Sequence, residues 1–342
     1  MEIPSANRRL AAGKDLGRED MKSVMMQIMS GKATDAQIGA FLTALMIKGE
    51  SVDELTGAAM IMRQLSAKVP AKAAKIVDSV GTGGDGAKLF NVSTASTLVA
   101  AAAGACMAKH GNRAATGNSG SADVLEASGV NIAITPEQVG QCIDRCGVGF
   151  MFAPAHHSAM RFAIGPRKEI GVRSIFNLLG PLTNPADAKF QLAGVFSRQW
   201  VRPMAEVYAE LGSLHTLVVS SEDGLDEISI AAPTRVVEYR DGVFSEYEIT
   251  PEQFGIERSD LGAITVSDPA QSLKMIRGAL GGRPGPAADM IALNAGATIY
   301  AGDLADSIEA GVARAREILS DGRALEKLAQ LVEISNSFEP GR

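Results

Sequence analysis

Cysteine is scarce in this sequence, and its distribution argues against two common ways of stabilising a chain. There are only three cysteines, at positions 106, 142 and 146. An odd number without a close Cys-x-x-Cys pair argues against a disulfide framework and against a structural zinc site. Cys142 and Cys146 stand one helical turn apart, a spacing that favours packing on a helix over redox or metal chemistry.

Long apolar runs and an excess of positive charge are also missing. The longest apolar stretch, TLVAAAAGACMA, has about twelve residues and is too short to span a membrane. The start, MEIPSANRRLAAGKDL, lacks the apolar segment of a secretory signal, so we expect a cytoplasmic protein with no membrane partner. With 33 Lys and Arg against 39 Asp and Glu, the net charge of −6 disfavours nucleic acid as a partner. An anionic small ligand must then be bound by locally arranged cations and backbone N–H groups.

The first part of the chain has a helical pattern. Apolar residues recur every three or four positions up to about residue 70, and glycines close the helical stretches at Gly31 and Gly49. A wide methionine-rich stripe fits either the core of a helical domain or a face partly buried against a second subunit. Its members are Met25, Met26, Met29, Met46, Met60 and Met62.

The rest of the chain alternates between strand and helix patterns. Strands are expected at 76–80, 105–109, 190–196 and 214–220, and helices at 92–104, 121–129, 136–146 and 199–212. This alternation predicts a mainly parallel sheet, with a hairpin at Asp241-Gly242 and further helices after residue 268. The predicted fold class is α/β. We expect a helical domain over 1–72, completed by helices near 165–185, and a larger α/β domain over 73–342.

The stretch VGTGGDGAKLFNVSTAS, residues 80 to 96, has the composition of a phosphate-binding loop. Its glycines satisfy G-x-G-x-x-G, but a dinucleotide site needs an acid about twenty residues further on, and the next acid after Asp85 is Asp123. A nucleotide-triphosphate loop needs Lys and then Ser or Thr after the second glycine, where this chain has Ala87-Lys88-Leu89. An ordinary strand-to-helix turn and a different phosphate site remain open.

Two further segments favour the phosphate site. Lys109 and His110 end a strand and lead into a second loop rich in Gly, Ser and Asn, so that two loops can enclose a ligand with two phosphate groups. Asp226-Glu227 is an adjacent acid pair of the kind that is usually solvated. A pyrophosphate substrate, however, needs Mg²⁺, which prefers one or two carboxylates with phosphate oxygens and water, and Ser93 offers a hydroxyl from the other side.

Several blocks, in this order, make the chain resemble the anthranilate phosphoribosyltransferase family. They are GTGGDG, FNVSTAS, KHGNRA, SGSADVLEASG, FMFAPAHHSAM, GVRSIFNLLGPLTNPA, DGLDEIS and LNAG. The resemblance implies a fold like that of nucleoside phosphorylases and related phosphoribosyltransferases. It also implies transfer of the phosphoribosyl group of phosphoribosyl pyrophosphate to the amine of anthranilate, with release of pyrophosphate, in tryptophan biosynthesis. Two Mg²⁺ ions per subunit and a homodimer formed through the helical domain are implied as well.

The resemblance also implies roles for individual residues. Those expected at phosphoribosyl pyrophosphate are Gly81, Gly84, Asp85, Asn91, Val92, Ser93, Thr94, Lys109, His110, Gly111, Asn112, Arg113, Ala114, Ala115, Thr116, Gly117 and Ser121. Those expected at anthranilate are Gly81, Asn112, Arg167, His110 and Pro181, and those at the metal are Ser93, Asp226 and Glu227. Lys109, Asp85 and His110 are the catalytic candidates. The chain departs from the family pattern at Leu89, Thr116-Gly117 and Gly165-Pro166.

The expected chemistry needs charge stabilisation more than a base. Loss of pyrophosphate from C1 of the ribose passes through an oxocarbenium-like state, so loop amides, Lys109 and metal must stabilise the departing anion. The acceptor amine is unprotonated at neutral pH, so we expect His110 to position groups rather than act as a base. Arg167 would pair with the anthranilate carboxylate, although without the resemblance a surface cation fits its sequence context equally well.

Two rival functions remain open on the sequence alone. A pyrimidine nucleoside phosphorylase has a similar architecture, but KHGNR and IFNLLGPLTNP fit the transferase better. A non-catalytic relative that binds nucleic acid is disfavoured by the retained glycines and acid pair and by the net charge of −6.

Overall fold

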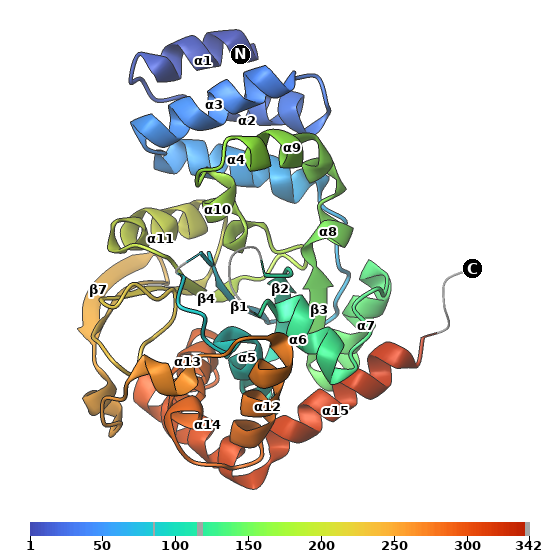
Figure 1. Cartoon of the computed structure of the whole chain (residues 1–342), viewed down its shortest axis with the longest axis vertical. Coiled ribbons are helices and arrows are strands. Elements are labelled where there is room, and N and C mark those ends of the chain that lie inside the picture. Colours follow the sequence, from blue (N-terminus) through green and yellow to red (C-terminus); the bar gives the residue numbers. More distant parts are fainter. Residues whose placement is uncertain (85, 115–118, 339–342) are drawn as a thin grey trace.

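The computed structural model describes residues 1–84, 86–114 and 119–338. It contains a helical lobe and a larger part with a β-sheet (Figure 1). Four consecutive helices and one later helix form the helical lobe. They are α1 (Ile3–Ala11), α2 (Arg18–Met29), α3 (Asp35–Lys48), α4 (Val52–Leu65) and α9 (Arg161–Glu169). Thr34 and Ser51 begin α3 and α4 with complete capping boxes, in which each hydroxyl accepts a backbone N–H three residues on.

A seven-stranded sheet lies below the helical lobe, in the order β3-β2-β1-β4-β5-β6-β7. The strands are β1 (Ile76–Gly81), β2 (Cys106–Gly111), β3 (Val148–Phe152), β4 (Phe190–Gly194), β5 (His215–Ser221), β6 (Thr234–Arg240) and β7 (Val243–Ile249). The first five are parallel to one another, and β6 and β7 extend the sheet in antiparallel fashion. Since β3 runs up into α8 (Ala153–His156) toward the helical lobe, the carboxyl ends of all five parallel strands face that lobe (Figure 1).

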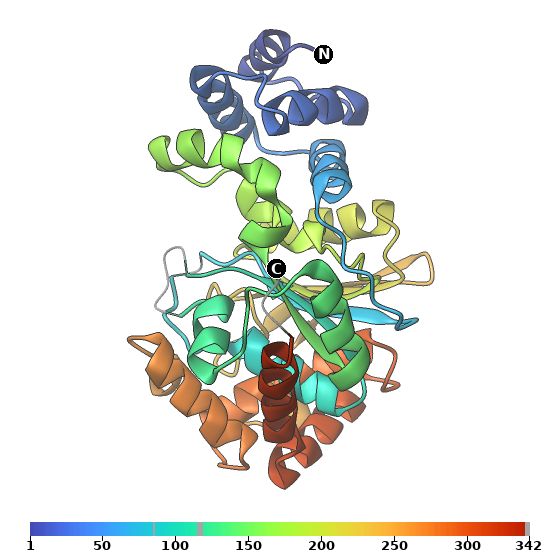
Figure 2. The ribbon, with the colours of Figure 1, turned by 90° about the vertical axis from the view of Figure 1, so that its right-hand side faces the viewer.

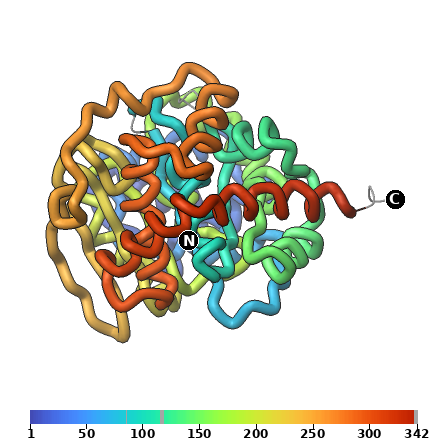
Figure 3. The backbone as a smooth tube through the Cα atoms, turned by 90° about the horizontal axis from the view of Figure 1, so that it is seen from below, coloured from blue at the N-terminus to red at the C-terminus, as the bar shows by residue number. Residues whose placement is uncertain are grey.

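Helices cover both faces of the sheet. On the side away from the helical lobe, α14 and α15 cross the molecule (Figure 3), while Figure 2 shows the lobe standing above the sheet. Side chains alternate along the strands as the pleat requires: Met107 joins the core around α5, and Ala108 joins the opposite cluster with α7. The remaining helices are α5 (Val92–Ala102), α6 (Ser121–Ser128), α7 (Pro136–Cys146), α10 (Phe176–Leu179), α11 (Val201–Glu210), α12 (Pro269–Leu280), α13 (Pro286–Ala301), α14 (Ile308–Asp321) and α15 (Arg323–Asn336).

One hydrophobic core connects the helical lobe with the sheet. It runs from α2 and α3 through α10 and α11 to the faces of β4, β5 and β6, where Ala193, Val218 and Val237 are buried. Met25, Met29 and Met62 of the methionine stripe are buried within this single chain, whereas Met26, Met46 and Met60 are only partly covered. Ile47 on the same lobe is 76% exposed. The stripe is therefore core for half of its members, and the other half lies nearer the surface.

The predicted fold class is confirmed, with differences in detail. The hairpin forms where expected, with Asp241 and Gly242 at φ of 51° and 82° joining β6 and β7. Cys142 and Cys146 are buried on α7 as packing residues. Strand β3 was not predicted, because VGFMF is an apolar run without alternation, a pattern that fits a buried strand or a helix segment equally well. Among the described helices, none has both the length and the apolar character needed to cross a membrane.

Candidate active site

The glycine-rich loop leaves the carboxyl end of β1 in a space that admits only glycine. A Cβ on Gly81 would overlap Oδ2 of Asp226, so no residue with a side chain fits there without a shift of the acid. The N–H of Gly83 donates to the same Oδ2 at 2.6 Å. Gly83 and Gly84 have φ of 66° and 78°, a left-handed conformation that residues with a side chain rarely adopt. Two features of the sequence, the glycines and the acid pair, therefore meet at one point.

Asn91 joins the two loops that the sequence placed around a phosphate ligand. As the N-cap of α5, it accepts the N–H of Thr94 through Oδ1 at 3.0 Å. Its Nδ2 donates to the carbonyl of Ser119 at 3.3 Å, which ties the second loop to the start of α5. Val92 and Thr94 are buried behind it, and Oγ1 of Thr94 has no hydrogen-bond partner within the described ranges.

Lys109 is the buried cation of the site. Its side chain lies at the end of β2, the residue is 3% exposed, and Nζ donates to the carbonyl of Ser79 at 2.8 Å and to Oγ of Ser93 at 3.0 Å. Burial lowers the pKa of Lys109, while the carboxylates of Asp78, Glu227 and Asp226 act in the opposite direction. A buried ammonium with nearby acids and a helix start is the arrangement expected around a bound phosphate group.

The second loop follows β2 with a similarly close contact. A Cβ on Gly111 would overlap Oγ of Ser121, and that hydroxyl donates to the carbonyl of Asn112 at 3.3 Å. Asn112, Arg113 and Ala114 are exposed. Four of the predicted site residues, Asp85, Ala115, Thr116 and Gly117, lie outside the described residues.

Arg113 has protein partners of its own. Its Nη1 lies 3.1 Å from Oδ1 of Asp123 and 2.6 Å from Oε2 of Glu126, both on α6. The backbone N–H of Ala114 donates to Asp123 at 2.9 Å, so the same acid fixes both residues. In this conformation the Arg113 guanidinium is held by α6.

The acid pair is not a solvated surface pair. Asp226 is 8% exposed and Glu227 is half-buried. Among described residues, no group of three His, Cys, Asp or Glu side chains forms a closed metal cage. The carboxylates of Asp226 and Glu227 act electrostatically on Lys109, which also binds the Ser93 hydroxyl, and all three groups are hard oxygen ligands of the kind that Mg²⁺ takes together with phosphate oxygens and water. The residues present therefore fit a magnesium ion.

Two neutral histidines, one of them the predicted acceptor residue His110, lie ring against ring at the end of β2. His110 is 5% exposed, and its ring lies 5.0 Å from that of His157 in an edge-on arrangement. Burial lowers the pKa of His110 well below its usual value and lowers the pKa of His157 to about 4, so both rings are neutral near pH 7. Pro181 follows Gly180, whose backbone faces the His110 ring, and its carbonyl accepts the hydroxyl of Tyr208 at 2.9 Å.

Two buried residues in this region were not singled out from the sequence. His157 lay inside the FMFAPAHHSAM block, and a repeated histidine next to a short helix was the available signal. Asp78 is fully buried in β1, accepts Nδ2 of Asn184 at 2.7 Å, and has its pKa raised to about 6 by burial. The signal for Asp78 was a charged residue inside an apolar strand pattern, KIVDSV.

Arg167, the predicted carboxylate partner, lies in the helical lobe. It lies on α9, half-buried, with Cζ 5.9 Å from the centre of the Phe176 ring, and burial lowers its pKa. In the described part of the chain, Arg167 forms no ion pair with a carboxylate and no hydrogen bond with Asn112 or His110. The predicted acceptor residues therefore come from four separate places in the fold. Gly81 ends β1, His110 and Asn112 lie at the end of β2, Pro181 begins a short 3₁₀ turn after α10, and Arg167 lies on the lobe helix α9.

The departures from the family pattern occupy different environments. Leu89 forms an isolated bridge with Thr265, and nothing in the surrounding contacts requires a hydroxyl at this position. Pro166 is buried inside α9, whereas a Cβ on Gly165 would meet open space. Thr116 and Gly117 lie outside the described residues.

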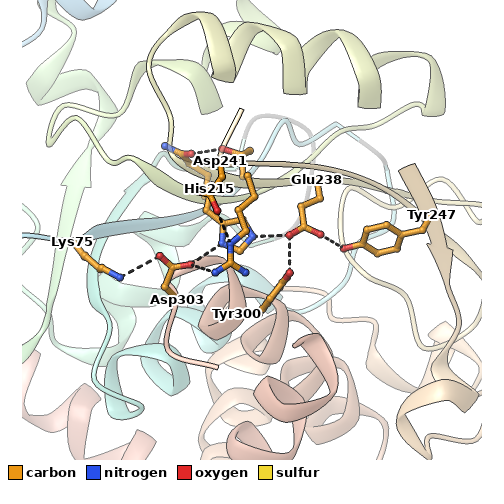
Figure 4. A network of polar contacts seen from close by, with 10 residues as sticks. Lys75, His215, Glu238, Asp241, Tyr247, Tyr300 and Asp303 are labelled. Atoms are coloured by element: carbon orange, nitrogen blue, oxygen red, sulfur yellow. Dashed lines mark hydrogen bonds and ion pairs between the residues drawn. The ribbon is translucent and has the colours of Figure 1, made fainter. Parts of the chain in front are cut away.

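The fourth histidine belongs to a network at the amino-terminal end of β5, opposite the ends that carry the loops. His215, the first residue of β5, places Nε2 2.9 Å from Glu238 and Nδ1 3.1 Å from Asp303 (Figure 4). Tyr247 and Tyr300 donate their hydroxyls to Glu238 at 2.9 and 2.7 Å. Because His215 lies at the amino end of a parallel strand, this network joins strands and α13 away from the loops and is structural.

The fold and the site together define a glycosyl transferase. The family description "Glycosyl transferase family, a/b domain" matches residues 73–325, and "Glycosyl transferase family, helical bundle domain" matches residues 4–66. Anthranilate phosphoribosyltransferase of Methylococcus capsulatus is 56% identical over 99% of this chain and 99% of its own length. That of Thermus thermophilus has a crystal structure with a TM-score of 0.92 and 42% identity, covering 97% of this chain and 99% of its own.

A more distant enzyme adds a ligand-bound structure. Anthranilate phosphoribosyltransferase from Saccharomyces cerevisiae, solved in complex with phosphoribosyl pyrophosphate and Mg, is 26% identical with a TM-score of 0.90, over 98% of both chains. The chain described here belongs to the anthranilate phosphoribosyltransferase family. It transfers the 5-phosphoribosyl group from phosphoribosyl pyrophosphate to the amine of anthranilate, releasing pyrophosphate, as a step of tryptophan biosynthesis.

Proposed function

We propose that the loops after β1 and β2, together with the start of α5, hold phosphoribosyl pyrophosphate through the residues that the sequence predicted. The observation that carries this proposal is the position of Lys109, whose buried ammonium is held between Ser79 of β1 and Ser93 of α5. The carboxylates of Asp78, Asp226 and Glu227 act on this ammonium, and the helix start beside it adds N–H donors that favour a further negative charge. Gly81, Gly84, Asn91 and Ser121, on the two loops, would supply further backbone and side-chain donors to the substrate.

The chain's own residues would promote loss of pyrophosphate mainly by stabilising charge. Backbone N–H groups of the first loop and of α5, with Lys109, face the anion that forms as the C1–O bond breaks. Donors that are already in place cost no reorganisation at that moment, which is why such stabilisation is large. The neutral rings of His110 and His157 offer no strong base, and the unprotonated aromatic amine requires none. His110 therefore shapes the acceptor wall, with Pro181 behind it.

We propose two Mg²⁺ ions per subunit, held by Ser93, Asp226 and Glu227 with the substrate's phosphate oxygens. When bound, such ions neutralise the developing negative charge of the leaving pyrophosphate. The contact between Gly83 and Asp226 supports this location, because it places an acid directly beside the phosphate loop.

Arg167 is the proposed partner of the anthranilate carboxylate. Its guanidinium is half-buried, stacks on Phe176 and has no acidic partner in the described chain, so a ligand carboxylate would compensate its charge. Asn112 and Gly81 would approach the acceptor from the sheet side. The amine and C1 would then be held together between α9 and the strand ends, which supplies a large part of the rate enhancement.

The remaining proposals concern organisation. We propose a helical domain over 1–72, completed by α9 and α10, and an α/β domain over 73–342. Partly covered Met26, Met46 and Met60 and exposed Ile47 support a homodimer formed through the helical domain. A cytoplasmic location follows from the proposed metabolic role.

A binding measurement tests the site assignment directly. Titration calorimetry of phosphoribosyl pyrophosphate with Mg²⁺ should give no measurable heat of binding for Lys109→Met under conditions where the unmodified protein binds. Lys75→Met is the matched control. Lys75 lies at the amino end of β1, away from the loops, where its Nζ is 3.2 Å from Oδ2 of Asp303. Unchanged affinity in Lys109→Met would contradict the assignment.

A further inference from the structure

Arg173 is an exposed cation whose guanidinium is nevertheless fixed at two points. It lies in the connection between α9 and α10. Its Nη2 donates to the backbone carbonyl of Gly84, and its Cζ lies 4.3 Å from the centre of the Phe196 ring. No carboxylate pairs with it within the described ranges. Its partners are therefore a peptide carbonyl of the phosphate loop and an aromatic face.

Phe196 is itself tied to the same loop. It follows β4, and its N–H donates to Oγ1 of Thr82 at 3.1 Å. The N–H of Thr82 donates in turn to the carbonyl of Gly194, at the end of β4, at 3.0 Å. Thr82, Phe196, Arg173 and Gly84 thus form a closed ring of contacts, which we call the Arg173 ring. It encloses the first residues of the glycine-rich loop.

The Arg173 ring holds a segment with two consecutive glycines, Gly83 and Gly84. Glycines lose more conformational freedom than other residues when a loop becomes fixed, and a contact that fixes them before the ligand arrives increases affinity. The guanidinium also holds the carbonyl oxygen of Gly84. A carbonyl oxygen that is bound to a cation cannot turn toward a phosphate group, which it would repel.

The same segment carries the proposed acceptor contact. Arg167 lies six residues before Arg173 in the sequence, and it stacks on Phe176, which lies three residues after Arg173. Between them Ser174 and Ile175 are buried, and the Ser174 N–H donates to Oδ1 of Asn177 at 3.0 Å. A shift of Arg167 on taking a carboxylate would therefore reach Arg173 and Gly84 through Phe176 and the buried residues Ile175 and Ser174.

We propose that Arg173 is a positioning residue that orders residues 82–84 and couples the binding of phosphoribosyl pyrophosphate to that of anthranilate. This inference rests on the proposed assignment of the first loop to phosphoribosyl pyrophosphate and of Arg167 to anthranilate. In this proposal Arg173 contacts neither substrate, and it acts through the backbone of the loop.

The test combines equilibrium binding with kinetics. In Arg173→Ala, the Kd of phosphoribosyl pyrophosphate with Mg²⁺, measured by calorimetry without anthranilate, should rise about tenfold, while kcat at saturating substrates stays within about threefold. The dependence of the KM for phosphoribosyl pyrophosphate on anthranilate concentration should disappear. Amide exchange of the peptide that contains Thr82–Gly84 should become faster, and that of α2 and α3 should not change.

Three variants separate loop positioning from a simple charge effect. Arg173→Lys keeps the charge but lacks the flat guanidinium that stacks and donates together, so it should not restore affinity. Phe196→Leu should reproduce the loss, and the double variant Arg173→Ala/Phe196→Leu should be no weaker than either single variant. Arg161→Ala is the control, because Arg161 stacks on Phe162 at 4.6 Å in the helical lobe without touching the loop.

The outcomes distinguish this inference from the proposed function. Normal affinity for phosphoribosyl pyrophosphate in Arg173→Ala, or full affinity in Arg173→Lys, would overturn the positioning role. The site assignment would still stand in that case, provided that Lys109→Met fails to bind the same substrate. Normal binding in Lys109→Met would overturn the site assignment itself, whatever Arg173→Ala does. The expected result is loss of binding in Lys109→Met, and a tenfold loss with no coupling in Arg173→Ala.

Discussion

Replacing Arg167 with alanine should weaken anthranilate binding selectively. The guanidinium is half-buried and has no competing carboxylate in the described chain, so a ligand carboxylate is its natural partner. A hydrogen bond to a charged group contributes about 1.5–3 kcal/mol. Because the Arg167 guanidinium is partly exposed, we expect its two-bond pair with the anthranilate carboxylate to contribute about as much as one such bond. A loss of about 2–3 kcal/mol corresponds to a rise of about 30- to 150-fold in the KM for anthranilate.

The assay follows the fluorescence of anthranilate as it is consumed, at fixed and varied phosphoribosyl pyrophosphate. Arg167→Lys should lie between the unmodified protein and Arg167→Ala, because it keeps the charge but not the fork. Thermal unfolding of each variant reports whether the lost stacking on Phe176 matters, and Arg161→Ala controls for loss of an arginine from the same helix. The reasoning is refuted if the KM values of both substrates rise equally, or if neither changes while the fold stays intact.

Three other replacements test the metal ligands, the buried cation and the network around His215. Asp226→Ala with Glu227→Ala should abolish Mg²⁺-dependent turnover, and undiminished activity would remove the metal assignment. Lys109→Met should lower kcat/KM for phosphoribosyl pyrophosphate by at least about 100-fold, as measured by initial rates, with Lys75→Met unchanged. Burial alone would raise the pKa of Glu238, but hydrogen bonds from His215, Tyr300 and Tyr247 outweigh it and lower that pKa. Their stabilisation is therefore present above the ordinary value near pH 4.3 and is lost as the pH falls below it. Glu238→Gln should lower the free energy of unfolding by roughly 1–3 kcal/mol at pH 7 and by less at pH 3, measured by urea denaturation.

Local signals in the sequence were enough for the architecture, and the same signals carry the proposed location of the site. Parallel strands end at one edge, so loops after β1 and β2 had to lie side by side once the alternation of strands and helices was recognised. The glycines and the Asp226-Glu227 pair were visible as separate short patterns. Their contact, Gly83 to Asp226, joins residues 143 positions apart and has no local signal.

Contacts between distant elements were the part that sequence patterns could not supply. Arg173 stands in a surface-like stretch, GVRS, and its role depends on Phe196 and Gly84, which come from two other segments. His157 and Asp78 matter because of burial, and burial of a polar residue follows from tertiary packing. The missed strand β3 has the same cause, since an apolar run without alternation fits a buried strand or a helix equally well.

The proposed site offers a way for a protein with a net charge of −6 to bind an anionic substrate. Asp226 stands directly beside the phosphate loop, where alone it would repel a pyrophosphate. In the protein described here, the N–H of Gly83 binds its carboxylate and the ammonium of Lys109 lies near enough to stabilise it. A divalent cation that arrives with the substrate would replace these partners and release the N–H of Gly83. We therefore expect metal and phosphoribosyl pyrophosphate to bind cooperatively, and each to bind weakly alone. The carboxylate of Asp226 attracts the metal but repels the anionic substrate, and the bound metal removes that repulsion.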